Sequence, residues 1–244
     1  MSHNNKRRQF LILISLFCIT VVAHASLPVS GERNQLINPG EIPNGLSASD
    51  WGDIQTQVSA GKYKAYPDVN GGYISSNPAH GWQIRYSDDG TTTLFSQDHA
   101  TSAYRLGFKL SAIGYSQLNP LHRPQQITAQ SSTVTYQWSD TLRERWVNSN
   151  NNLEQWFILD KRSTGAIKQQ PLTVQMTLDS DLKAILRGNA ISFTTPSGST
   201  ISYNKLKVWD ANGRELPATM QLAGQTLSLI VEDAHASYPL TIDP

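Results

Sequence analysis

The sequence predicts an all-β protein with one or two antiparallel β-sandwich units preceded by a short α-helix. From Tyr63 onward, apolar and polar residues alternate with a period of two, as in strands with one buried face. Turn-forming residues recur about every ten residues, which is typical of sandwiches and barrels rather than of alternating βα units. A hydrophobic content of 39% with 16% charged residues indicates a chain that folds.

The first 25 residues have the organisation of an export signal. Residues 6–8 (Lys-Arg-Arg) are basic, and Phe10–Val22 is an apolar stretch too short to span a bilayer comfortably. Residues 23–25 (Ala-His-Ala) have the small side chains that signal peptidase requires, so we expect cleavage after Ala25. The alternative is an uncleaved membrane anchor. We therefore expect an exported protein, secreted, periplasmic or at the cell surface, with no membrane span in its mature chain.

Charge and cysteine content exclude several function classes. The 20 basic and 19 acidic residues are nearly balanced, and no basic cluster occurs in the body of the chain, which argues against nucleic acid as a partner. The single cysteine, Cys18, lies within the export signal. A mature chain without cysteine has no disulfide, no cysteine-based zinc site and no cysteine nucleophile. We expect no cofactor.

Composition suggests how the rest of the chain is organised. Residues 26–45 are rich in Pro, Gly and Asn without periodicity, which predicts an extended lead-in segment. The stretch Ser116–Gln125 contains two prolines and is the best candidate for a boundary between two β units or sheets. We therefore divide the remainder into a helix plus N-terminal β unit over 46–118 and a C-terminal β-sandwich unit over 119–244.

The one helix is expected over Ser47–Ser59. A serine at its start, Ser47 or Ser49, can accept the unpaired backbone N–H groups of the first turn. Three apolar residues at helical spacing share one face, and we expect this stripe to face the core. The stripe consists of Trp51, Ile54 and Val58.

Sixteen strands are expected, separated by turns. The Asp88-Asp89-Gly90 sequence is a strong hairpin signal, because Asp-Gly supplies the positive φ that such turns require. The expected strands are Tyr63–Pro67, Gly72–Ser76, Trp82–Ser87, Thr91–Phe95, Tyr104–Leu110, Ile127–Gln130, Val134–Trp138, Leu142–Asn148, Leu153–Leu159, Leu172–Leu178, Leu182–Leu186, Ile191–Thr195, Thr200–Tyr203, Lys205–Trp209, Thr226–Val231 and Tyr238–Ile242.

Two glutamates are the candidates for an acid and base pair. Glu144 and Glu154 lie on neighbouring predicted strands, as the carboxylate pair of a polysaccharide-active enzyme would. The interpretation we favour is that they form cross-strand ion pairs with Arg143 and Arg145 on a solvent-facing surface. We therefore predict that the protein is not an enzyme and has no catalytic residues.

Other catalytic and metal patterns are weak. Gly198-Ser199 lies in a turn and lacks the context of a nucleophile elbow. The histidines of the mature chain are isolated from one another, which argues against a metal site. They are His80, His99, His122 and His235.

Calcium is the closest metal candidate. Asp210-Ala211-Asn212-Gly213, followed by Glu215, offers several oxygen ligands around a glycine, and Asp88-Asp89-Gly90 offers two adjacent carboxylates. Both patterns fit hairpin turns better, and we predict no bound metal.

Aromatic residues suggest a sugar-binding surface as an alternative function. Trp82, Trp146 and Trp156 could form a platform on which a sugar ring stacks. Trp138, Trp146 and Trp156 also recur at the strand positions expected of a sandwich core, which is the interpretation we favour.

Two motifs in the last third of the chain carry a resemblance. Residues 201–218 (ISYNKLKVWDANGRELPA) and 238–244 (YPLTIDP) resemble the β-rich N-terminal region of large exported bacterial proteins that carry FG-GAP (integrin-α-like) or related β-propeller repeats. Segments 77–82, 143–148 and 153–157 look like further parts of the same region.

The resemblance implies a function. In such proteins the closing motif is where the N-terminal region meets the first propeller repeat, so we expect a truncated module. No repeats follow Pro244, and their Ca²⁺ loops and adhesive surface do not carry over. The family offers no catalytic residues. We therefore expect a non-catalytic structural or interaction module of a cell-surface or secreted protein, with a propeller or surface partner; the alternative is a carbohydrate-binding module that binds a glycan.

Overall fold

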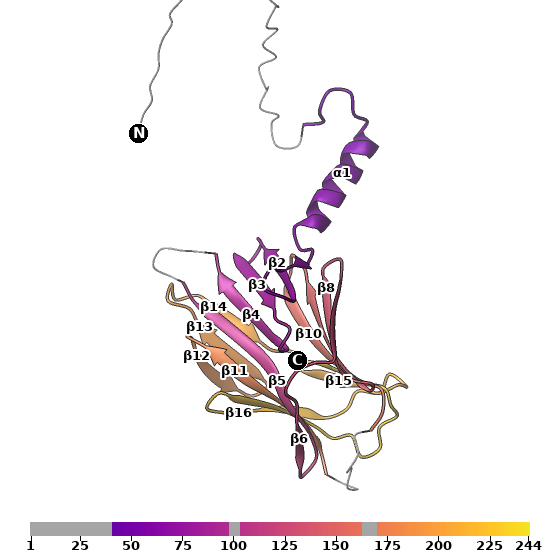
Figure 1. Ribbon diagram of the computed structural model, residues 1–244, viewed down its shortest axis with the longest axis vertical. Coiled ribbons are helices and arrows are strands. Elements are labelled where there is room, and N and C mark those ends of the chain that lie inside the picture. Colours follow the sequence, from indigo (N-terminus) through magenta and orange to yellow (C-terminus); the bar gives the residue numbers. More distant parts are fainter. Residues whose placement is uncertain (1–40, 98–102, 163–169) are drawn as a thin grey trace, which may run out of the picture. The chain divides into compact units, whose positions relative to one another are not determined.

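The structure is a computed structural model of the chain and describes residues 41–97, 103–162 and 170–244. The predicted export signal and residues 26–40 of the lead-in segment lie outside the described residues, as does His99. Residues 46–244 form one compact unit. This unit contains a helix followed by antiparallel strands, which confirms the predicted fold class (Figure 1). In the described ranges, no helix is long and apolar enough to cross a membrane.

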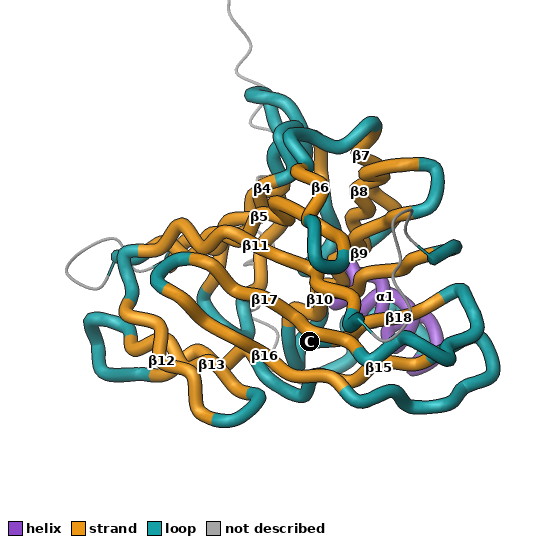
Figure 2. The backbone as a smooth tube through the Cα atoms, turned by 90° about the horizontal axis from the view of Figure 1, so that it is seen from below, coloured by secondary structure: helices purple, strands orange, loops and turns teal. Residues whose placement is uncertain are grey.

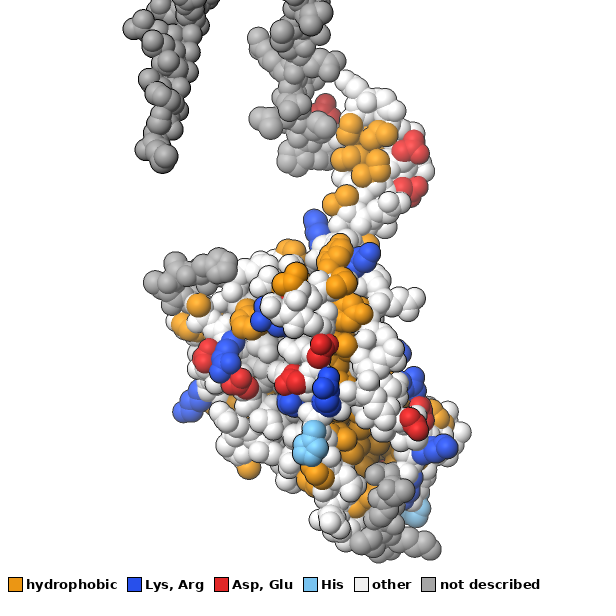
Figure 3. Space-filling view, in the orientation of Figure 1, with side chains coloured by type: hydrophobic (Ala, Val, Ile, Leu, Met, Phe, Trp, Pro, Cys, Tyr) orange, Lys and Arg blue, Asp and Glu red, His pale blue; other side chains and the backbone are white. Residues whose placement is uncertain are grey.

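Helix α1 spans Ala48–Gly61, close to the predicted range. Ser47 caps it, because its Oγ accepts a hydrogen bond from the backbone N–H of Asp50 and the Asp50 carboxylate accepts one from the N–H of Ser47. The expectation that its apolar stripe faces the core is wrong. The helix has no buried residue, and Ile54 and Val58 are 39% and 58% exposed. Figure 3 shows hydrophobic side chains gathered on the surface of α1.

Sheet A is the largest sheet, with nine antiparallel strands in the order β1-β2-β3-β4-β5-β11-β17-β16 and with β6 paired to β5. Figure 2 shows β5, β11, β17 and β16 running side by side. Its strands are β1 (Tyr66–Pro67), β2 (Tyr73–Asn77), β3 (Trp82–Tyr86), β4 (Thr91–Ser96), β5 (Arg105–Gly114), β6 (Leu118–Pro120), β11 (Leu172–Ser180), β16 (Ala218–Ala223) and β17 (Thr226–Val231).

Sheet B has six antiparallel strands in the order β15-β18-β10-β9-β8-β7. They are β7 (Gln126–Gln130), β8 (Thr133–Ser139), β9 (Leu142–Asn148), β10 (Leu153–Leu159), β15 (Lys207–Trp209) and β18 (Leu240–Asp243). Sheet C is a smaller meander of β12 (Lys183–Arg187), β13 (Ala190–Thr194) and β14 (Thr200–Tyr203).

Sheets A and B face each other across the main core. The ring of Phe108 on β5 lies 5.9 Å from that of Trp146 on β9, and Thr92 Oγ1 on β4 lies 3.2 Å from the Tyr136 hydroxyl on β8. Sheet C adds Tyr203, which stacks on Phe108 at 5.3 Å. All three sheets therefore contribute to one hydrophobic cluster.

The chain passes from sheet A to sheet B within the predicted boundary stretch Ser116–Gln125, since β6 ends at Pro120 and β7 begins at Gln126. The two sides of this boundary are nevertheless not separate units. β5, which precedes it, pairs with β11, which follows it, from Gly107 opposite Asp179 to Gly114 opposite Thr173. The ranges 46–118 and 119–244 therefore share a sheet and a core instead of forming two separate β units.

The hairpin predicted at Asp88–Gly90 joins β3 to β4. Gly90 has a φ of +87°, and its N–H donates to the Ser87 carbonyl at 2.9 Å. A Cβ at this position would lie 2.3 Å from the indole ring of Trp138 on β8. Only glycine meets both requirements, so this turn is fixed by its backbone and by the close approach of sheet B.

Candidate functional site

The two motifs that carry the resemblance meet in space. β15, from the first motif, pairs with β18, from the second, with Val208 opposite Ile242 and Trp209 opposite Thr241. Both Val208 and Ile242 are fully buried. Residues about thirty positions apart in sequence thus form one edge of sheet B, and we call the element made of residues 207–216 and 232–243 the C-terminal junction.

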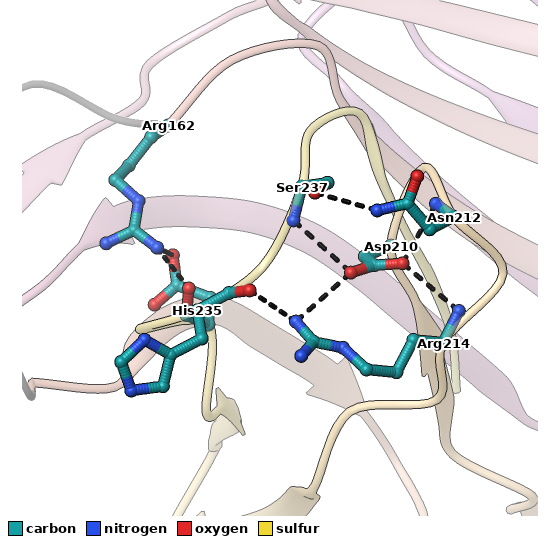
Figure 4. Close-up of polar contacts among 7 residues, drawn as sticks. Arg162, Asp210, Asn212, Arg214, His235 and Ser237 are labelled. Carbon is teal, nitrogen blue, oxygen red and sulfur yellow. Dashed lines mark hydrogen bonds and ion pairs between the residues drawn. The ribbon is translucent and has the colours of Figure 1, made fainter.

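Asp210 holds the junction together (Figure 4). Its carboxylate accepts backbone N–H groups from Asn212 at 2.9 Å, Arg214 at 3.1 Å and Ser237 at 3.3 Å. The Arg214 guanidinium lies 3.2 Å from Oδ2, and it also donates to the His235 carbonyl. The side chain of Asp210 is only 1% exposed. Its oxygens are therefore occupied by protein donors, which fits the predicted turn and not a calcium site.

The same contacts set the charge of Asp210. Burial acts to raise the pKa of this carboxyl, but the N–H groups of Ser237, Arg214 and Asn212, together with the Arg214 charge, outweigh it and lower the pKa. The carboxylate therefore stays ionised, as an acceptor of several N–H donors must.

A second buried carboxylate of the junction is that of Asp233. It accepts the hydroxyls of Tyr115 at 2.7 Å and Tyr238 at 2.6 Å, and the guanidinium of Arg162 lies 3.6 Å from Oδ2 and donates to the Asp233 carbonyl. Burial, followed by the hydrogen bond to Asp233, raises the pKa of Tyr115 to about 12 and that of Tyr238 further. Both phenols therefore remain donors, and Asp233 connects the segment after β5 with the segment before β18.

A surface hollow of about 420 Å³ adjoins these contacts. Its lining combines two acidic groups, an arginine, a histidine and apolar residues, which is a composition suited to contact with another protein surface. The lining residues are Arg214, Glu215, Leu216, Pro217, Glu232, Ala234 and His235.

Glu144, a sequence candidate for catalysis, lies at the centre of the sandwich. It is 0% exposed, and its carboxylate accepts the indole N–H groups of Trp138 and Trp146 at 2.8 and 2.9 Å and the amide of Gln155 at 2.7 Å. Gln155 in turn accepts the Tyr203 hydroxyl at 2.7 Å. Burial raises the pKa of Glu144 to about 7, against the opposing effect of the three N–H donors.

The structure does not bring Glu144 and Glu154 together. Glu144 pairs with Phe157 and points into the core, whereas Glu154 pairs with Val147, which lies on the outer face of sheet B. The expectation that Glu144 forms a solvent-facing ion pair is wrong, because its strand neighbours Leu142 and Trp146 are buried on the same face. These two carboxyls therefore cannot act as an acid and base pair across one substrate.

The three candidate tryptophans do not form one platform. Trp146 is 2% exposed and points inward from β9, while Trp156 is half-buried on the outer face of β10. Trp82 lies on the inner face of sheet A, stacks on His80 at 4.6 Å and donates to the Tyr104 hydroxyl at 2.8 Å. Trp82 and Trp146 share the lining of a small apolar hollow of about 50 Å³ between the sheets.

Metal ligation finds no support in the described part of the chain. Residues 41–97, 103–162 and 170–244 contain no group of three or more His, Asp or Glu side chains that could hold a metal ion. His80 is engaged with Trp82, and His235 lines the hollow at the junction.

Sequence reasoning missed Asp233 and the outward arginine Arg145 as residues of interest. Asp233 follows β17 in a loop, where a lone carboxylate carries no pattern. The sequence could have placed Arg145 and Glu144 on opposite faces of β9, since successive residues of a strand point to opposite faces of the sheet.

Comparison of the chain with protein-family models, with curated proteins and with solved structures gave no match.

Proposed function

We propose that the chain is a non-catalytic, exported structural module that corresponds to the N-terminal β region of a cell-surface or secreted repeat protein. The observation that carries the proposal is the C-terminal junction, in which both motifs of the resemblance combine around Asp210 and Asp233. Such a rigid edge beside a hollow of mixed character is suited to packing against a following domain.

The lack of a catalytic role is supported by how the buried acidic groups are used. Glu144 accepts three internal N–H donors, and Asp210 accepts three backbone N–H groups and an arginine. Groups held in this way stabilise a fold, because their lone pairs do not face a substrate.

Export is supported by the basic and apolar pattern of residues 1–25. The test is to produce the full chain in a Gram-negative bacterium, to fractionate the cells and to determine the N-terminus of the product. Recovery outside the cytoplasm with Ser26 as the first residue is the expected result. A chain that stays in the cytoplasm with residues 1–25 attached would refute the export proposal.

Docking to a repeat domain is tested with a fusion. An FG-GAP-type β-propeller placed after Pro244 should unfold in calorimetry as one unit with the chain, at a higher temperature than the separate parts. Asp210→Ala should uncouple the two transitions, whereas Asp88→Ala, at an exposed turn outside the junction, should not. Independent unfolding of the unmodified fusion would refute docking.

The second candidate function, a carbohydrate-binding module, receives support from one residue of the original three. Trp156 alone of the candidate tryptophans lies on the outer face of sheet B.

A further inference from the structure

The outer face of sheet B carries a continuous row of polar and aromatic side chains. Thr128 on β7 lies opposite Thr135 on β8, Thr135 opposite Arg145 on β9, and Arg145 opposite Trp156 on β10. Directly opposite residues have Cβ atoms about 4.5–5.5 Å apart, so these side chains are immediate neighbours on one surface.

A groove of about 370 Å³ lies at one end of this row. Its lining consists of hydroxyl groups, one amide and one guanidinium, and these residues alternate with the core residues of β7, β8 and β9. The lining residues are Thr128, Gln130, Ser131, Thr133, Thr135 and Arg145.

Arg145 lacks the partners that a half-buried cation requires. Among the described residues it has no ion pair, and its buried Nε has no hydrogen-bond acceptor. The Nε of Arg143, its neighbour on the same face, also lacks an acceptor, but the Arg143 guanidinium pairs with Asp160 at 2.5 Å. A buried donor without an acceptor is costly, and a charged one more so. The groove therefore presents a cation whose missing partner is an anion.

Acidic side chains lie outside the groove. Its lining contains no acidic residue. Near Trp156, the charge of Asp243 is opposed by that of Glu154 and favoured by those of Lys205 and Lys207. An anionic group of a ligand is thus favoured in the groove, at Arg145.

We propose that this face binds an acidic polysaccharide, with the carboxylate of a uronic-acid unit on Arg145. Guanidinium groups bind carboxylates through two parallel hydrogen bonds. Threonine, serine and glutamine side chains both donate to and accept from sugar hydroxyls. The indole of Trp156, next to Arg145, supplies a flat surface for the apolar side of an adjoining sugar ring.

Other ligand classes fit less well. The groove has one arginine and no lysine, whereas a nucleic acid or a highly sulfated chain is held by several cations. Its lining has no apolar pocket to receive the side chain of an acidic peptide. The proposal goes beyond the structural role proposed above and does not depend on docking to a repeat domain.

The test is calorimetric titration of the purified protein with oligogalacturonate. Neutral oligogalactose, poly-glutamate and dextran sulfate are the comparison ligands. Oligogalacturonate should bind, and its methyl ester and the neutral sugar should bind at least about tenfold more weakly, since a charged hydrogen-bonded contact is removed. Absence of oligogalacturonate binding, or equal binding of poly-glutamate or dextran sulfate, would overturn the assignment.

Variants locate the site. Arg145→Gln should weaken oligogalacturonate binding about tenfold or more, and Arg145→Lys should recover only part of it, because it keeps the charge but not the paired geometry. Thr128→Val, at an exposed strand position, is a second variant that leaves the fold intact and should weaken binding severalfold. Arg187→Gln, exposed on sheet C, is the matched charge control. Unchanged binding by both Arg145→Gln and Thr128→Val would refute the site.

Discussion

Glu144 makes the stability of this protein depend on pH in a predictable direction. Its pKa is about 7 in the folded chain, against an ordinary value of 4.5, because burial disfavours the charged form. Below pH 4.5 the carboxyl is protonated in both states, and its contribution to stability is fully present. As pH rises toward 7, the unfolded chain ionises first, which favours unfolding. Stability is therefore lost through this window and levels off above it.

The difference between the two pKa values corresponds to about 3 kcal/mol of folding free energy lost between pH 4.5 and 7. Glu144→Gln removes this titration. The variant should be less stable than the wild type at pH 5, because an amide nitrogen cannot accept an indole N–H. By pH 8 the difference should shrink or reverse, by about 3 kcal/mol relative to pH 5.

The assay is urea unfolding of both proteins at pH 5 and pH 8, followed by tryptophan fluorescence, with Glu232→Gln as a control at an exposed carboxyl. The free energy of unfolding of the control variant should equal that of the wild type at both pH values. A wild-type minus Glu144→Gln difference that stays constant to within about 1 kcal/mol between the two pH values would refute the assignment of a raised pKa to Glu144.

Three further predictions test other parts of the structure. Gly90→Ala should lower the free energy of unfolding, measured by urea denaturation, by more than about 2 kcal/mol, because it combines a strained φ with a clash against an indole ring. The control Gly188→Ala, where φ is +58° and no atom of the described residues lies near the added Cβ, should lower it by about 1 kcal/mol. Joint replacement of Ile54 and Val58 by serine should change stability by less than about 0.5 kcal/mol, because neither is buried; a larger loss in calorimetry would show a contact for α1. Asp210→Ala should lower the thermal midpoint and make its decline at acid pH smaller, since the wild-type carboxylate has a lowered pKa and its contribution is lost as pH falls; an unchanged midpoint would show that its four contacts are dispensable.

Alternation in the sequence was sufficient to predict most of sheets A and B. The predicted ranges Leu142–Asn148, Leu153–Leu159 and Thr226–Val231 coincide with β9, β10 and β17. These strands have one buried and one open face, so the period of two is visible in their side chains. The helix start was predictable for the same local reason, since the cap at Ser47 involves only its own first turn.

The parts that were missed depend on contacts distant in sequence. β6 is three residues long and ends in a proline, and β16 buries only Met220, so neither shows a clear period. The apolar residues of α1 have the spacing of a buried face, but a face is buried only where another element packs against it, and the spacing does not show whether one does. The division into two units near residue 118 was wrong because β5 pairs with β11, whose residues lie about sixty to seventy positions further along the chain.

The two faces of β9 have different roles, which three consecutive residues illustrate. Glu144 points inward to a closed set of hydrogen bonds, and Arg143 and Arg145 point outward on either side of it. The three donors are Trp138 on β8, Trp146 on β9 and Gln155 on β10, so Glu144 connects three neighbouring strands beneath the outward arginines. Glu144→Gln should therefore alter the pH dependence of folding while oligogalacturonate affinity, measured where the variant is fully folded, stays within about threefold of the wild type. A large loss of affinity in a folded Glu144→Gln protein would mean that the inner network also positions Arg145, and that the two faces of β9 are energetically coupled.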